Sequence, residues 1–286
     1  MKFNKLCSLL LLATATLSVQ AASVWKVSSD KHTLYIGGTI HILSPEDYPL
    51  PSEYDVAYEA ADKVVFETDM VAVNGLEFQQ KMMAKLVYSD GTTIDKVLNA
   101  DTYAALKQHM EQRNVPIAAM ATLKPSLIAI TLSIMELQAL GFTSEGVDQF
   151  YANKSQADGK PQSWFETPDE QIDFIVNLGK EDESGMIDYA IKDIKKLPET
   201  INALRDSWRE GDMQAMADVS IDDFKADYPQ IYQDLLVDRN NNWLPKIEVM
   251  LQDQPTEFIL VGGLHLAGPD SVLTKLAAKG YKIEKL

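Results

Sequence analysis

Two histidines end near-matching phrases at opposite ends of this chain. Residues 35–41 read Tyr-Ile-Gly-Gly-Thr-Ile-His, and residues 259–265 read Ile-Leu-Val-Gly-Gly-Leu-His. An apolar run that stops at glycines and then presents a histidine is typical of a buried strand delivering an imidazole at its end. Two such strands side by side would bring His41 and His265 together. Imidazole is the commonest metal ligand and a frequent general base.

A carboxylate in the same kind of position joins the two imidazoles. Glu67 ends the run Lys-Val-Val-Phe-Glu at residues 63–67, and this β-branched run predicts a buried strand. Two imidazoles and one carboxylate are a familiar ligand set for a catalytic zinc, manganese, cobalt or iron ion. Such an ion lowers the pKa of a bound water molecule. His41 and His265 are therefore candidate metal ligands, and Glu67 is a third ligand or the general base.

The glycines of both phrases have a physical reason at such a site. A strand that bends sharply at its end, or a backbone that lies close to a ligand, favours a residue without a Cβ. Gly38, Gly262 and Gly263 are therefore expected to support the site.

Each of these residues also has a plainer interpretation. A single histidine after a strand is more often a hydrogen-bonded structural residue, and Glu67 alone would be an acid paired with a lysine or arginine. The chain has only four histidines, so their repetition in a rare context favours a shared site. The residues alone leave both interpretations open. The other two histidines, His32 and His109, are expected to be in solvent.

Strand patterns concentrate at the two ends of the chain, and helical patterns fill the middle. Strands are expected at residues 23–28, 33–36, 63–67, 162–165, 257–261 and 281–284. Helices are expected at residues 52–61, 74–88, 116–140 with a break before Pro125, 145–157, 184–196, 199–210, 212–219, 228–252 and 271–279. Two more helices are expected from their caps, one after Asp101 and one after Thr167.

This order of elements predicts an α/β fold. The expected architecture is a mixed, mostly parallel central sheet flanked by helices, with a large helical insertion. Ligands of open α/β sheets gather beyond the carboxyl ends of the strands. His41, Glu67 and His265 all follow strands in that sense.

The first residues have the layout of a secretory signal peptide. Lys2 and Lys5 precede an apolar stretch from Leu6 to Val19, and Val19-Gln20-Ala21 fits a cleavage site. We expect residues 1–22 to be removed and residues 23–286 to form one domain in the periplasm or outside the cell. The stretch is too short for a membrane span, and no later segment is apolar enough for one.

Composition narrows the classes of partner. The single cysteine, Cys7, lies in the expected signal peptide, so no disulfide is expected to stabilise the mature chain. The net charge of −16 argues against nucleic acid and against anionic membrane surfaces. A peptide or a small molecule remains the expected substrate, and the oligomeric state is left open.

The histidine phrases and several smaller segments resemble the TraB/GumN family of exported bacterial proteins. The matching segments are 38–41, 60–69, 145–148, 165–167, 208–212, 239–243 and 262–265. The animal relatives of this family, the Tiki proteins, are described as metal-dependent proteases. The family is also similar in fold to the erythromycin esterases and to ChaN, a haem-binding protein.

The resemblance implies a function and roles for five residues. It implies a metal-dependent hydrolase of peptidase type, in which His41, Glu67 and His265 are essential. Glu166 and Arg239 match polar positions of the same cleft, and Arg239 would steady a developing oxyanion. Their plainer interpretation is that Glu166 organises the helix after Thr167 and that Arg239 neutralises a buried acid.

The similarity to ChaN supports an alternative of a different class. On the same scaffold, the chain would be a non-catalytic periplasmic protein that binds haem, a metal ion or another small ligand. No His-Glu-x-x-His, Gly-x-Ser-x-Gly, phosphate loop or dinucleotide motif is present to name another chemistry.

Overall fold

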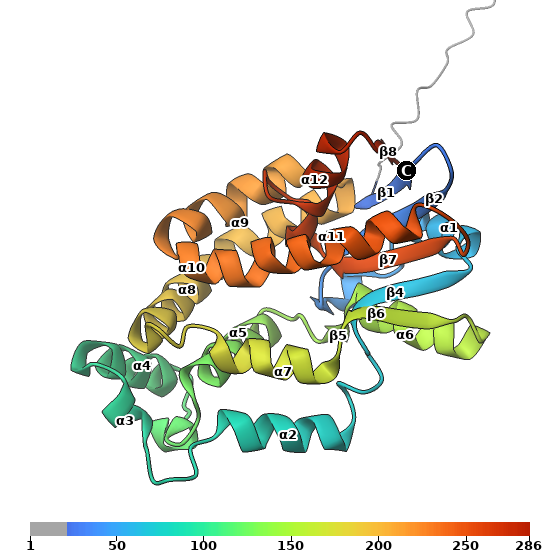
Figure 1. Ribbon diagram of the computed structural model, residues 1–286. Coiled ribbons are helices and arrows are strands. Elements are labelled where there is room, and N and C mark those ends of the chain that lie inside the picture. Colours follow the sequence, from blue (N-terminus) through green and yellow to red (C-terminus); the bar gives the residue numbers. More distant parts are fainter. Residues whose placement is uncertain (1–21) are drawn as a thin grey trace, which may run out of the picture.

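The fold is given by a computed structural model, which describes residues 22–286. Its centre is a six-stranded sheet of strand order β6-β4-β7-β2-β1-β8, with helices packed around it (Figure 1). The pairs β6–β4, β4–β7 and β7–β2 are parallel, and the pairs β2–β1 and β1–β8 are antiparallel. The α/β class and the mixed, mostly parallel sheet predicted from the sequence are confirmed.

The elements have the following bounds. The strands are β1 Val24–Ser28, β2 Thr33–Thr39, β3 Ile42–Leu43, β4 Lys63–Thr68, β5 Ser144–Glu145, β6 Gln162–Glu166, β7 Glu257–Gly262 and β8 Lys282–Lys285. The helices are α1 Ser52–Ala60, α2 Leu76–Leu86, α3 Ile94–Val97, α4 Ala100–Gln112, α5 Pro125–Ala139, α6 Val147–Asp158, α7 Pro168–Asn177, α8 Glu183–Glu210, α9 Met213–Asp227, α10 Pro229–Tyr232, α11 Asp238–Met250 and α12 Val272–Ala278. Short 3-10 helices span Pro45–Asp47, Ile117–Met120 and Gly263–Leu266.

The two histidine phrases form adjacent parallel strands in the middle of the sheet. β2 and β7 pair with Ile36 opposite Ile259 and with Gly38 opposite Val261. Parallel strands run in the same direction, so both end at the same edge of the sheet. β4 pairs with the other side of β7 and carries Glu67 to that edge as well.

Apolar side chains cover both faces of the central strands. Phe258 and Leu260 of β7 lie in one core with residues of α1, α6, α8 and α9, whereas Ile259 and Val261 lie in a second core with α11 and α12. Successive side chains of a strand point to opposite faces, which explains why the residues of β7 from Phe258 to Val261 are all apolar.

A third apolar core belongs to helices beside the sheet. It holds residues of α4, α5 and α8 such as Leu106, Ile128 and Ile191. In Figure 1, α4 lies at the lower left of the molecule, and the strands of the central sheet lie to its right. α8 joins the two parts of the molecule, because its Ile191 lies in this core and its Trp208 in the core of the sheet.

Four helices differ from their predicted course, and the largest extension is that of α9, which was expected to end at residue 219 and runs to Asp227. α8 runs through Pro198 without the break expected there. α4 is capped by Asn99, whose side chain accepts a hydrogen bond from the Thr102 amide, and Asp101 lies inside the helix. The helix expected at 228–252 is interrupted by a π-helical turn at Gln233–Val237. The π-helical turn has nearly the same apolar period as the α-helix around it, so the apolar pattern of the sequence does not distinguish the two.

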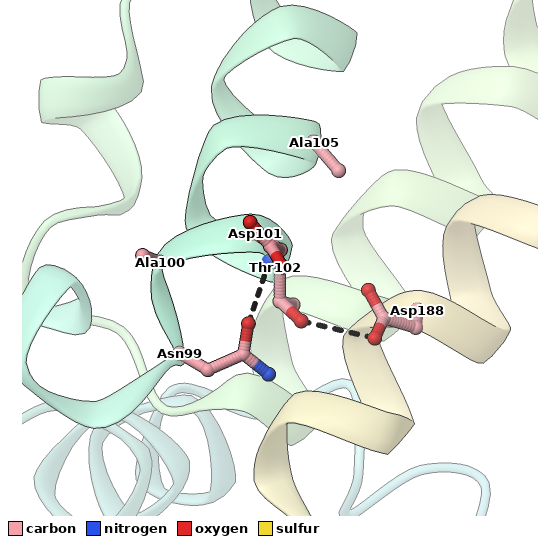
Figure 2. Close-up of a pocket in the computed structure, with 6 residues that line it drawn as sticks. All are labelled: Asn99, Ala100, Asp101, Thr102, Ala105 and Asp188. Carbon is pink, nitrogen blue, oxygen red and sulfur yellow. Dashed lines mark hydrogen bonds between the residues drawn. The ribbon is translucent and has the colours of Figure 1, made fainter.

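The helical part contains a surface pocket lined by residues of α4 and by Asp188 of α8. Figure 2 shows that Thr102 and Asp188 face one another across it, and the Thr102 hydroxyl donates to the Asp188 carboxylate at 2.9 Å. Asn99 in the same pocket is used as the cap of α4. His109 of α4, which we expected in solvent, is instead buried beside Arg113.

No helix within residues 22–286 has both the length and the apolar character needed to cross a membrane. The signal peptide predicted for residues 1–22 lies outside the described residues, apart from Ala22.

Glu257, the first residue of β7, predicts a pH dependence of stability. Its side chain is buried, its Oε2 has no hydrogen-bond partner within residues 22–286, and its Oε1 lies 3.9 Å from the Lys63 ammonium. Burial raises the pKa of Glu257 to about 7, against the smaller opposing effect of the Lys63 charge. The folded chain then holds a proton that the unfolded chain has already lost, so stability falls as pH rises from about 4.5 to about 7.

Between about pH 4.5 and pH 7, we therefore expect wild type to lose up to about 3 kcal/mol of unfolding free energy through this group, and Glu257→Gln to lack that loss. Urea unfolding of both proteins across this pH range measures it. Glu77→Gln, at an exposed position of α2, is the matched control. Equal pH slopes for wild type and Glu257→Gln would contradict the expectation.

Candidate active site

The three predicted side chains converge at one point beside Gly262. A Cβ built on Gly262 would lie 3.3 Å from Glu67 Oε1, 3.6 Å from the His265 ring and 3.8 Å from His41 Nε2. These side chains come from the ends of β4, β7 and β2, as strand order requires. A residue larger than glycine would fill the space between them, which explains Gly262.

The other two predicted glycines bring β2 and β7 together at this edge. A Cβ on Gly38 would lie 3.4 Å from Gly263 Cα, and a Cβ on Gly263 would lie 3.1 Å from Met216 Sδ. The Gly38 carbonyl also accepts a hydrogen bond from the Trp208 indole at 2.9 Å. Both glycines thus permit close packing behind the site and do not enter it.

His265 is held in one orientation and is neutral. Its Nδ1 donates to Asn240 Oδ1 at 2.7 Å, and its Nε2 accepts from Arg239 Nη1 at 3.2 Å. The ring packs on Trp243, with centroids 4.4 Å apart. Burial lowers the pKa of His265 to about 3, with Arg239 acting in the same direction. Its Nε2 lone pair therefore faces the other site residues at neutral pH.

His41 is exposed and is oriented by a carboxylate. Its Nδ1 lies 3.1 Å from Asp148 Oδ1, and its side chain is 66% exposed. The charge of Asp148 raises the pKa of His41 to about 9, an effect that solvent screens at this exposure. Nε2 of His41 points toward the site, 3.8 Å from a Cβ built on Gly262.

Glu67 is ionised and fully hydrogen-bonded. Its Oε1 accepts from the Gly262 amide at 2.7 Å, and its Oε2 accepts from Arg239 Nη2 at 2.6 Å. Burial acts to raise the pKa of Glu67, but Arg239, the two histidines and the Gly262 amide together hold that pKa far below its usual range. A carboxylate in this state is a persistent negative charge.

Arg239 joins the two carboxylates of the site. It bonds Glu67, and it also donates from Nε and Nη2 to the two oxygens of Glu166 at 2.8 and 2.9 Å. The Trp243 indole donates to Glu166 Oε1 at 2.8 Å. Arg239 lies in the first turn of α11, directly after the π-helical turn at Gln233–Val237. π-helical turns frequently occur at functional sites, where they change the direction in which the next side chains point.

A cavity of about 260 Å³ opens beside these residues. His41, Glu67, Asp148 and Arg239 form its polar side, whereas His265 lies deeper and does not line it. The site therefore has an accessible face, through His41 and the cavity, and a buried face at His265.

The donor chemistry of the cluster fits a divalent metal ion. Both imidazoles use Nδ1 for a polar partner and present Nε2, which is the usual orientation of metal-binding histidines, and Glu67 adds a carboxylate. Within residues 22–286, no three His, Cys, Asp or Glu side chains are placed to hold an ion as they stand. Arg239 occupies Nε2 of His265, so an ion bound there has to displace this guanidinium.

The sequence patterns identified the central residues and missed the partners that orient them. Asp148 and Asn240 hold the two imidazoles, and Trp243 holds both His265 and Glu166. All three lie in segments that carried the family resemblance, at 145–148 and 239–243. That overlap was a signal that could have found them.

Comparison with known proteins gives one match. The model of the TraB/PrgY/gumN family matches residues 23–285, which is nearly the whole chain. No curated protein and no solved structure matched in the corresponding comparisons. On the strength of the family match, the chain belongs to the TraB/PrgY/gumN family.

Proposed function

We propose that this protein is an exported, metal-dependent hydrolase that cleaves peptide bonds at the cluster of His41, Glu67 and His265. The observation that carries the proposal is the convergence of these three side chains within 4 Å of one point beside Gly262. They come from distant segments and lie at an accessible cavity. Packing alone gives no reason for two imidazoles and a carboxylate to meet there.

The residues have separate tasks in this proposal. His41 and His265 would hold a manganese, cobalt, zinc or iron ion through Nε2, with Glu67 as the third ligand. When bound, such an ion polarises a carbonyl and lowers the pKa of a water molecule. The depressed pKa of Glu67 suits a ligand better than a general base, which works best with a pKa near the operating pH.

Arg239 and His41 have the tasks that require movement. Arg239 must leave Nε2 of His265, and its guanidinium would then be free to hydrogen-bond an oxyanion that develops on the substrate. His41 must lose the proton on its Nε2 before it can act as a ligand. Its exposure allows that proton to pass to solvent.

The place of action is proposed from the N-terminal segment. The signal peptide layout of residues 1–22 supports a periplasmic or secreted protein. The substrate would be a peptide or another small molecule met outside the cytoplasm.

Peptide cleavage with Glu67→Gln tests the proposal. We expect the mature protein, incubated with a mixture of peptides and manganese or zinc, to produce new peptide termini detectable by mass spectrometry. Glu67→Gln should lower the rate by at least about 100-fold, because it removes the ligand charge. Glu77→Gln, an exposed glutamate of α2, is the control and should cleave like wild type. Cleavage that survives a chelator, or is unchanged in Glu67→Gln, would contradict the proposal.

A further inference from the structure

Two threonine hydroxyls beside the cavity have no hydrogen-bond partner among the described residues. Thr39 and Thr68 line it from the ends of β2 and β4, and they are 3% and 7% exposed. Neither hydroxyl oxygen has a partner within residues 22–286. Buried polar groups are nearly always hydrogen-bonded, so two unpaired hydroxyls at one cavity call for a ligand. A rotation about Cα–Cβ is the only change that either side chain needs to redirect its hydroxyl.

The same cavity has an apolar wall. Met70, Val73 and Phe78, from the segment after β4 and the first turn of α2, face Leu260 of β7 around it. Its volume of about 260 Å³ is below the range of about 300–1,000 Å³ that holds drug-sized ligands. The cavity is therefore suited to one small group, part of which is apolar.

The charged side chains that line the cavity are already paired, and Arg239 is shared with Glu166 as well. Glu67 and Asp148 are acidic, and Arg239 and His41 are basic. Each acid is already paired with one of these bases, Glu67 with Arg239 and Asp148 with His41. A ligand with a net charge of either sign would find no free counter-charge here. A neutral hydrogen-bond acceptor, by contrast, would find the two threonine hydroxyls.

We propose that this cavity is a subsite that binds one apolar side chain of the substrate together with the neutral amide next to it, whose carbonyl and N–H groups pair with the hydroxyls of Thr39 and Thr68. Met70, Val73 and Phe78 would contact the side chain. The inference rests on the proposed function, because it places the bound substrate residue next to the peptide bond that is cleaved. It makes leucine-like residues the preferred neighbours of that bond.

Binding of four small probes to the metal-free mature protein tests the subsite without catalysis. The probes are N-acetyl-leucinamide, N-acetyl-glycinamide, N-acetyl-leucine and leucinamide. Compared with the first, the second lacks the side chain, the third carries a negative charge and the fourth carries a positive charge. Affinities are measured by NMR chemical-shift titrations in the presence of a chelator. We expect N-acetyl-leucinamide to bind at least about tenfold tighter than each of the other three probes. Only this probe combines an apolar side chain for the apolar wall with an uncharged amide on each side for the threonine hydroxyls.

Variants then locate the binding. Thr39→Val and Thr68→Val remove a hydroxyl at constant shape, and each should weaken N-acetyl-leucinamide about tenfold. Neither should lower the thermal unfolding midpoint, because the lost hydroxyl has no partner in the free protein within residues 22–286. Phe78→Ala should weaken N-acetyl-leucinamide and leave N-acetyl-glycinamide unchanged. Thr102→Val, in the pocket of Figure 2, is the control and should bind like wild type.

Three results would overturn the subsite. They are equal affinity for the leucine and glycine amides, tighter binding of either charged probe, and full affinity in both valine variants. Because no metal is present, these results leave the metal-dependent cleavage untouched. Loss of cleavage in Glu67→Gln, in turn, says nothing about the probes, so the two proposals can fail separately.

Discussion

Arg239→Met is expected to destabilise the protein by about 3–5 kcal/mol. The guanidinium bonds both Glu67 and Glu166, and both acids are largely buried. Without it, two carboxylates remain out of water and lose the counter-charge that they share. Chemical denaturation at neutral pH measures the loss.

The pH dependence and a compensating variant separate this cause from lost packing. Without Arg239, burial would raise the pKa of Glu67, so the deficit should grow as pH rises above about 4.5. Adding Glu67→Gln and Glu166→Gln to Arg239→Met should recover most of the lost stability, because neutral amides replace the unpaired charges. A loss below about 1 kcal/mol, or no recovery in the triple variant, would contradict the assignment of Arg239 as the counter-ion.

Gly146→Ala is expected to cost about 3 kcal/mol and to disturb His41. A Cβ on Gly146 would overlap the Ile40 carbonyl oxygen and the His41 carbonyl group. These are backbone atoms, so the chain before α6 has to move away from the end of β2. That movement separates Asp148 from His41, whose Nδ1–Oδ1 contact is 3.1 Å. Thermal or urea unfolding gives the cost in stability.

A histidine titration gives the effect of this substitution on the site. With Asp148 withdrawn, the pKa of His41 should fall toward its usual value, as read from its ring proton shifts. Gly75→Ala is a matched control, because Gly75 also caps a helix in extended conformation and its nearest contact is 3.0 Å from the new Cβ. Similar losses in the two variants would show that the close approach at Gly146 is not the cause.

The sheet could be predicted from sequence because its signals are local. β-branched and apolar runs mark β1, β2, β4 and β7, and the glycine–histidine phrases mark the ends of two of them. β2 extends through Gly37 and Gly38 to Thr39, beyond its predicted end, because pairing with β7 supports the glycines. Helix interruptions were harder, since a π-helical turn has nearly the periodicity of the helix around it.

The residues of the site likewise divide into those with a local sequence signal and those whose contacts depend on the packing of distant elements. His41, Glu67 and His265 could be predicted because each lies at the end of a strand of one sheet or just beyond it. The bonds of Arg239 to His265, Glu67 and Glu166 depend on how α11 lies across the sheet, which no short-range pattern encodes. The unpaired hydroxyls of Thr39 and Thr68 likewise become visible only when the possible partners within residues 22–286 have been placed.

Metal content per chain tests the central claim most directly. The mature protein, dialysed against manganese or zinc and then against buffer, is analysed by plasma mass spectrometry beside His41→Ala/His265→Ala. His32→Ala, a histidine outside the cluster, is the control. We expect about one ion per chain in wild type and control and none in the double variant. Equal metal in wild type and double variant would contradict the claim that these imidazoles hold the ion.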